Sequence, residues 1–204
     1  MPIDESIFDL FDRVGKDLSN RGLNTSHSGN ISIRNGGKMI IKARAAMLGW
    51  LKPEDLVETS LEDEDSFTLI ASTEAQVHRK IYHETDAMAI VHAHCPYSVA
   101  LSLIEDEIEC IDAEGSFMYK KIPVVQLDVP AGASEAAIKV PPMLKNYKAV
   151  IIRTHGVFAK GATLEDALCT ITGVEQSAMI RYLTLQTGKP LKQDLSKSKN
   201  LDVW

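Results

Sequence analysis

The arrangement of apolar segments along the chain constrains the fold most. Short strand-like runs tend to occur in pairs, and stretches with helical spacing separate them. The strand-like runs are SGNISIR (28–34), MIIK (39–42), VETSLEDEDSFTLI (57–70), AMAIVHAH (87–94), IPVVQLDV (122–129) and AVIIRTHGVFAKG (149–161). This alternation predicts an α/β fold: a mixed, mainly antiparallel central sheet with helices on both faces.

The segments between these runs carry the signals of helices and turns. The predicted helices cover residues 4–20, a segment from Thr73, 96–103, 134–140 and about 163–187. Thr73 and Gln76 have the spacing of a capping box, which predicts a helix start. Pro141 and Pro142 are expected to interrupt the fourth helix. Residues 57–70 are interpreted as two short strands around an acidic turn.

The length of 204 residues suits one domain with its own apolar core. The sequence contains no internal repeat and no linker long enough to divide it. We therefore expect a single domain over residues 1–190, followed by a polar C-terminal tail at 191–204.

Composition excludes several classes of protein. The net charge is -6 with both signs interspersed, so the basic face typical of nucleic-acid binding is not expected. Cys95, Cys110 and Cys169 are odd in number and lack a CxxC spacing, which favours a reducing, cytoplasmic location. No apolar run approaches the roughly 20 residues of a membrane span. The acidic, amphipathic segment MPIDESIFDLF is unlike a signal peptide.

Three histidines form a candidate metal site. His92 and His94 lie two residues apart near the end of a predicted strand, where period-two geometry directs both imidazoles to one side. His155 ends another apolar strand, and Gly156 after it allows a sharp backbone turn. Three imidazoles around a zinc-like ion leave one coordination position open, which is typical of catalytic sites.

The same histidines allow a simpler interpretation. Histidines at strand ends often bond only to backbone groups or to water, and an HxH pair alone is a weak signal. Cys95 follows His94 directly but faces the opposite side of a strand, so we expect a buried or helix-capping thiol there. His27 is expected beside the pocket.

An acidic residue and two small-residue segments form a candidate anion site. Glu74 stands at a predicted helix start, directly after Ser72 and Thr73, where free backbone N–H groups favour a phosphate. Ser28, Gly29 and Asn30 form a second candidate cradle, because glycine lets the backbone approach an anion and asparagine supplies an amide. The alternatives are a helix cap at 72–73, a simple turn at 29–30 and a solvated carboxylate at Glu74.

Taken in order, these motifs resemble the class II sugar-phosphate aldolase family, whose fold is shared by the adducin head. The matching stretches are HSGNISIR (27–34), STEAQVHRKIYHETDAMAIVHAH (72–94) and RTHGVFAKGATLEDAL (153–168). The resemblance covers nearly the whole chain before the tail.

The resemblance implies a metal-dependent carbon–carbon lyase. It implies Zn²⁺ on His92, His94 and His155, although imidazole also accepts other divalent transition metals. It implies Glu74 as catalytic acid/base. Lewis-acid contact would then assist cleavage of the C3–C4 bond of a ketose 1-phosphate, giving dihydroxyacetone phosphate and an aldehyde.

The resemblance also implies a substrate and an assembly. The substrate is a small phosphorylated sugar, either similar to L-fuculose 1-phosphate or a 5-deoxy or methylthio pentulose phosphate. Gly29, Asn30, Ser72 and Thr73 would hold its phosphate. The family further implies a ring-shaped homotetramer with active sites at subunit interfaces.

Two positions depart from the family pattern. Aldolases of this type carry a Thr/Ser-Gly pair where this chain has Arg44 and Ala45. Arg44 is either a replacement phosphate ligand, a contact for a different anion, or a surface residue. Aldolases also tend to have a tyrosine proton donor near Gln126, and Tyr119 is the candidate substitute.

The sequence leaves several functions open beside the aldolase. A methylthioribulose-1-phosphate dehydratase of the same fold needs no proton donor to a leaving aldehyde, which suits the missing tyrosine. A decarboxylase or epimerase relative is a further possibility. A non-catalytic, adducin-like module is expected to have lost metal ligands or the glutamate, which this chain keeps. The residues alone would also permit a zinc hydrolase with Glu74 as base.

Overall fold

One sheet runs through the whole computed structural model, which describes residues 3–195. Its strands are β1 (Asn30–Asn35), β2 (Lys38–Lys42), β3 (Leu56–Ser60), β4 (Ala89–Ala93), β5 (Glu107–Glu109), β6 (Lys121–Val125), β7 (Ala149–Ile152) and β8 (Gly156–Gly161). Their order is β3-β2-β1-β4-β8-β7-β6-β5. All neighbours pair antiparallel except β6 and β7, so the predicted mixed, mainly antiparallel sheet is confirmed.

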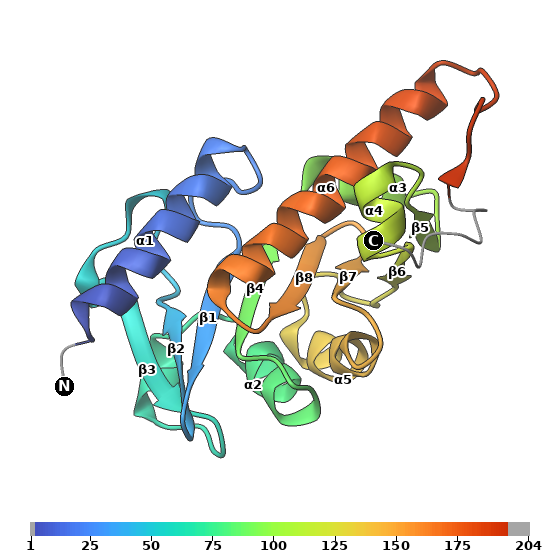
Figure 1. Cartoon of the computed structure of the whole chain (residues 1–204). Coiled ribbons are helices and arrows are strands. Elements are labelled where there is room, and N and C mark those ends of the chain that lie inside the picture. The colour runs from blue at the N-terminus through green and yellow to red at the C-terminus, as the bar shows by residue number, and fades with distance from the viewer. Residues whose placement is uncertain (1–2, 196–204) are drawn as a thin grey trace.

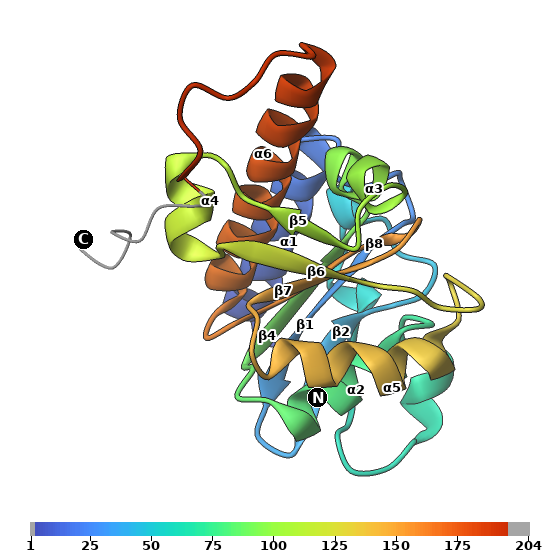
Figure 2. The ribbon, with the colours of Figure 1, turned by 90° about the vertical axis from the view of Figure 1, so that its right-hand side faces the viewer.

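Helices cover both faces of this sheet, as predicted. They are α1 (Glu5–Asn20), α2 (Ala75–Glu84), α3 (Pro96–Ser102), α4 (Ala113–Met118), α5 (Ala133–Leu144) and α6 (Leu164–Gln186). Figures 1 and 2 show α1 and α6 on one face and the adjacent helices α2 and α5 on the other. Most of the predicted tail, 196–204, lies outside the described residues.

The core is divided in two by the sheet, because successive strand residues face opposite sides. On β4, Val91 packs with α1 and α6, whereas Ile90 packs with α2 and α5. On β7, Ile151 likewise packs on the face of α1 and α6, whereas Val150 packs on the face of α2 and α5. This alternation leaves the ends of the central strands free to carry polar groups.

Two predicted elements were wrong. Residues Ser66–Leu69 form a 3-10 turn rather than a second strand. The Asp65 side chain accepts hydrogen bonds from the backbone N–H groups of Phe67 and Thr68, which closes the turn.

The fourth predicted helix is not interrupted by its prolines, because α5 continues through Pro141 and Pro142. Its apolar stripe spans the prolines, and Val140 and Leu144 are both fully buried against the sheet. Packing of this stripe compensates for the hydrogen bonds that the prolines cannot donate.

The last helix was predicted well. α6 spans Leu164–Gln186, and the Thr163 side chain caps it by accepting from the N–H of Asp166. It packs against both β8 and β4. Among the helices of residues 3–195, none combines the length and apolar character needed to cross a bilayer.

Substituting Gly15 tests how closely α1 packs against the backbone at Leu48. An added Cβ would lie 2.1 Å from the carbonyl oxygen of Leu48, so Gly15→Ala should reduce the free energy of unfolding by about 1–3 kcal/mol through overpacking. Urea titration followed by circular dichroism measures this. The control is Gly37→Ala, where nothing lies within 4 Å; equal stability of the two variants would contradict this packing.

Candidate active site

His92, His94 and His155 converge at one end of the sheet. His92 lies in β4, His94 follows that strand, and His155 lies in the turn between β7 and β8. Their ring centroids are 5.0, 4.9 and 4.7 Å apart. One nitrogen from each ring lies within 4.8 Å of the others, close enough for all three to share one cation.

Strand register fixes the position of His92, the most deeply buried of the three histidines. β4 pairs His92 with Asn30 of β1 and with Phe158 of β8. The Phe158 ring stacks on the imidazole at 4.1 Å. Nδ1 of His92 lies 3.0 Å from the carbonyl oxygen of Val157. Because a carbonyl only accepts, Nδ1 carries the hydrogen and Nε2 keeps its lone pair.

The electrostatic environment keeps the imidazoles in the form that binds metals. Burial lowers the pKa of His92 well below its ordinary value, and the neighbouring histidines add to this effect. The pKa of His94 is lowered too, first by burial and then by His155. Both rings are therefore neutral at pH 7.

Two ring nitrogens also lack hydrogen-bond partners. Nε2 of His92 and Nδ1 of His155 are buried and form no hydrogen bond within the described residues. Buried nitrogens without partners are unfavourable unless a ligand is bound. Three converging imidazoles, two of them with such a nitrogen, fit a divalent transition metal ion.

Glu74 lies beside the histidines. Its Oε2 accepts a hydrogen bond from Nδ2 of Asn30 at 2.6 Å and lies 3.4 Å from Nε2 of His92. The carboxylate is only 8% exposed. It is thus fixed with one oxygen close to the point where the three rings meet.

The predicted capping box at the start of α2 was wrong. The helix begins at Ala75 with Glu74 as N-cap residue and no side-chain capping bond. Ser72 Oγ instead accepts from the N–H of Glu74 at 3.3 Å. The Glu74 side chain accepts a hydrogen bond from Asn30 and does not cap the helix.

A pocket of about 170 Å³ opens beside the histidines. The residues proposed from sequence that line it are Gly29, Asn30, Arg44, Ser72, Thr73, Glu74, His94 and His155. His92 lies beneath, fully buried. Gly29 has φ +72°, and a Cβ there would lie 2.4 Å from the Asn24 side chain, so this wall requires glycine.

Sequence reasoning missed Lys42, which also lines the pocket. Its side chain is 2% exposed, and Nζ donates to the carbonyl oxygens of Ala46 at 2.6 Å and His27 at 3.3 Å. Burial lowers its pKa. A lysine that closes an apolar strand two residues before Arg44 was the available signal. Ala131 was also missed, whereas Ser28 of the candidate cradle and His27 line the pocket as expected.

Tyr119, the candidate proton donor, lies elsewhere. Its hydroxyl is next to Gly173 of α6, and burial raises its pKa to about 12. Gln126 donates to the carbonyl oxygen of Leu127 at 3.0 Å. Within residues 3–195, no tyrosine lines the pocket.

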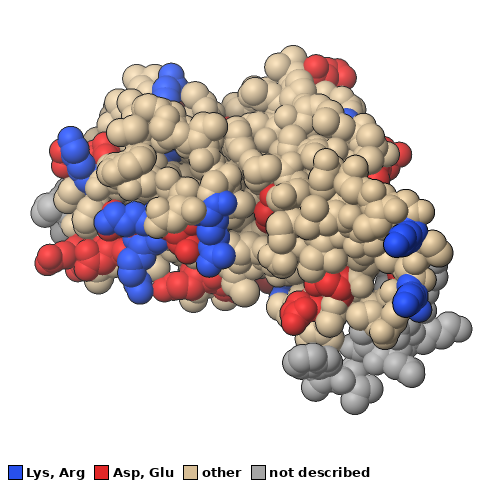
Figure 3. Space-filling view, turned by 90° about the horizontal axis from the view of Figure 1, so that it is seen from above, with Lys and Arg blue, Asp and Glu red and all other residues tan. Residues whose placement is uncertain are grey.

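The view from above shows a hollowed surface with both kinds of charge. A depression separates two halves of the molecule, and acidic and basic side chains both occur around it (Figure 3). On that face the basic side chains form no continuous band.

Comparison with known families agrees with this fold and site. The class II aldolase and adducin N-terminal domain family matches residues 11–182. The chain belongs to this family. Among its members it is a lyase of the class II aldolase type, which sets aside the non-catalytic adducin-like alternative.

Individual relatives are similar over most of the chain. An L-fuculose phosphate aldolase of Methanocaldococcus jannaschii is 30% identical over 180 residues, 88% of this chain and 97% of the relative. A 5-methylthioribulose-1-phosphate/5-deoxyribulose-1-phosphate aldolase of Rhodospirillum rubrum is 28% identical, covering 87% and 80%. The crystal structure of L-fuculose-1-phosphate aldolase from Thermus thermophilus superposes with a TM-score of 0.85 at 35% identity, covering 91% and 97%.

A buried histidine behind Glu74 predicts the pH dependence of stability. Nδ1 of His78 lies 2.7 Å from Ser32 Oγ, and burial lowers its pKa to about 3. Between pH 3 and 6.5 the unfolded chain therefore binds a proton that the folded chain excludes, so stability falls as pH falls through this window.

Urea unfolding of metal-free protein at about pH 5, 6 and 7 measures this effect. We expect His78→Gln to flatten the pH slope by up to about 1.4 kcal/mol per pH unit. Slopes are compared rather than absolute stabilities, because the substitution also changes packing. Parallel slopes for wild type and variant would show that His78 is not the proton-linked group.

Proposed function

We propose that the protein is a metal-dependent aldolase that cleaves a ketose 1-phosphate reversibly to dihydroxyacetone phosphate and an aldehyde. The convergence of three imidazole nitrogens within 4.8 Å, beside a buried carboxylate, carries this proposal. The aldolase names of the relatives support it.

We assign His92, His94 and His155 as ligands of Zn²⁺ or another divalent transition metal. The bound ion would supply Lewis acidity toward the carbonyl and hydroxyl oxygens of the substrate. The backbone carbonyl of Val157 orients the His92 ring for ligation.

Glu74 is the proposed acid/base. Reversible cleavage leaves a carbanion on the dihydroxyacetone phosphate half, and that carbon must gain or lose a proton. Asn30 fixes one carboxylate oxygen at 2.6 Å, and Glu74 lines the pocket where substrate carbon would lie. A positioned carboxylate of this kind suits proton transfer.

The phosphate is proposed to bind at the part of the pocket wall formed by Gly29, Asn30, Ser72, Thr73 and Arg44. Ser72 Oγ accepts from Glu74 N–H, which leaves its own hydrogen available for an anion. Because α2 begins at Ala75, just after this wall, the positive end of its helix dipole adds to the attraction for an anion.

Arg44 and Lys42 would add positive charge to this wall. The Arg44 guanidinium is exposed and forms no ion pair with any residue in 3–195. It can therefore turn toward a phosphate, whereas the Thr/Ser-Gly pair of related aldolases would offer hydroxyl and backbone donors.

A methylthioribulose-1-phosphate dehydratase is the second candidate. The observation that favours it is the missing tyrosine, since no tyrosine of the described residues lines the pocket. Loss of water from the sugar phosphate requires no proton donor at a leaving aldehyde. The metal ligands and Glu74 would serve either reaction.

A homotetramer with interfacial active sites, in the cytoplasm, completes the proposal. Leu69 and Ile70 are 77% and 56% exposed, and the carbonyl of Ile70 bonds to the N–H of Arg44 at the pocket wall. Apolar side chains exposed beside a pocket suit a subunit contact. Light scattering should give a tetramer, and a monomer would refute this assembly.

Products distinguish the two reactions. Zinc-loaded enzyme should convert a ketose 1-phosphate from a small panel into dihydroxyacetone phosphate and an aldehyde, detected by mass, and a strong chelator should abolish this. Loss of water without carbon–carbon cleavage would establish the dehydratase instead. Full turnover in the chelator would reject the metal site.

Glu74→Gln should reduce turnover roughly 10²- to 10⁴-fold, the usual contribution of a general acid/base. The variant should keep one metal per chain, since Glu74 is not assigned as a ligand. Glu84→Gln, an exposed carboxylate on the same helix, is the control. Near-normal turnover in Glu74→Gln would exclude the role.

Arg44→Ala should weaken binding of dihydroxyacetone phosphate roughly 10-fold, because a charge-assisted contact is lost. Binding of unphosphorylated dihydroxyacetone should not change. Calorimetry measures both, with the exposed Arg13→Ala as control. An equal loss for both ligands would argue against an anion contact.

A further inference from the structure

The turn that carries His155 has an unusual backbone. The N–H of His155 bonds to the carbonyl of Ile152 at 3.0 Å, which closes a four-residue turn. Thr154 occupies the third position with φ +67°. This is the geometry of a type II turn, which normally has glycine or asparagine there. A β-branched residue with positive φ is strained, so contacts with surrounding residues must stabilise this conformation.

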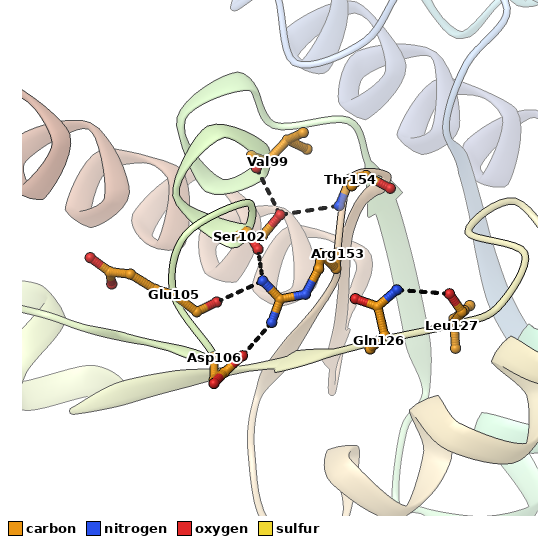
Figure 4. A network of polar contacts seen from close by, with 8 residues as sticks. All are labelled: Val99, Ser102, Glu105, Asp106, Gln126, Leu127, Arg153 and Thr154. Carbon is orange, nitrogen blue, oxygen red and sulfur yellow. Dashed lines mark hydrogen bonds and ion pairs between the residues drawn. The ribbon is translucent and has the colours of Figure 1, made fainter.

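Ser102, the last residue of α3, stabilises this backbone conformation. Its side chain is fully buried. Ser102 Oγ donates to the carbonyl of Val99 at 2.7 Å and accepts from the N–H of Thr154 at 3.2 Å (Figure 4). Because its only hydrogen is used on Val99, its lone pairs face the turn. An acceptor fixed at this N–H favours the flipped central peptide of a type II turn over that of type I.

Arg153, the second residue of the turn, is tied to the same end of α3. Its guanidinium donates to the carbonyls of Ser102 and Glu105 and to the carboxylate of Asp106 (Figure 4). Its own N–H bonds to the carbonyl of Val125 at 2.9 Å. Both central residues of the turn are therefore held from outside it.

The other end of α3 adjoins the second strand of the site. The helix begins at Pro96, just after His94 and Cys95. The carboxylate of Glu175 on α6 accepts from the N–H groups of Tyr97 and Ser98 at 2.8 and 2.9 Å. One seven-residue helix thus joins the strand end of His94 to the turn of His155.

We propose that Ser102 is a positioning residue for His155. Its hydroxyl holds the strained Thr154 peptide so that the His155 imidazole faces His92 and His94. The inference rests on the proposed metal site but assigns a function to a residue that touches neither metal nor substrate.

Zinc affinity and its rescue test the proposal. Ser102→Ala should weaken zinc binding roughly 10- to 100-fold, as expected for loss of an outer-shell contact. Ser102→Ala with Thr154→Gly should recover most of the affinity, because glycine adopts positive φ without help. Competition against a chromophoric chelator measures each dissociation constant.

The control is Ser116→Ala in α4. Ser116 is also fully buried, and its Oγ donates to the carbonyl of Cys110 at 2.8 Å. Loss of this bond should reduce stability and leave zinc affinity unchanged, which separates positioning from general destabilisation.

The possible outcomes are distinct. Zinc binding by the wild type with unchanged affinity in Ser102→Ala would overturn the positioning role alone. Failure of Thr154→Gly to rescue, or equal weakening in Ser116→Ala, would also overturn it. Wild-type protein that binds neither zinc nor cobalt would overturn the proposed metal site and this role together.

Discussion

The pairing of β4 with β1 and β8 is the constraint on which the site depends. It places Asn30, His92 and Phe158 side by side on one face of the sheet. A slip of one residue would send every side chain of β4 to the other face. His92 would then lie among the apolar residues under α1 and α6, and Glu74 would lose its neighbour.

Burial gives this arrangement its chemical character. His92 and Glu74 are buried next to each other, and each side chain is held by one further hydrogen bond: His92 by the carbonyl of Val157 and Glu74 by Asn30. The neutral imidazoles of His92 and His94 lie close to a fixed carboxylate, with little water to screen their interactions. Lys42 and Arg44 line the same pocket and bring positive charge to it.

Much of this fold follows from local pattern. The apolar strand β4, the helix α1 and the extent of α6 each depend on neighbouring residues, and sequence reasoning found them. The three histidines were grouped from their positions at strand ends. Other features depend on distant contacts: the Glu74 side chain at the start of α2 bonds to Asn30, 44 residues away. Lys42 was missed because its partners lie on separate loops, and α5 keeps its prolines because the sheet supports it.

The Lys42 ammonium has a consequence for how the pocket responds to its surroundings. It ties the loop of His27 to the loop of Ala46 while lying almost wholly out of contact with water. Dissolved ions screen a buried charge of this kind far less than they screen a charge on the surface. The electrostatic effect of Lys42 within the pocket therefore depends only weakly on salt concentration.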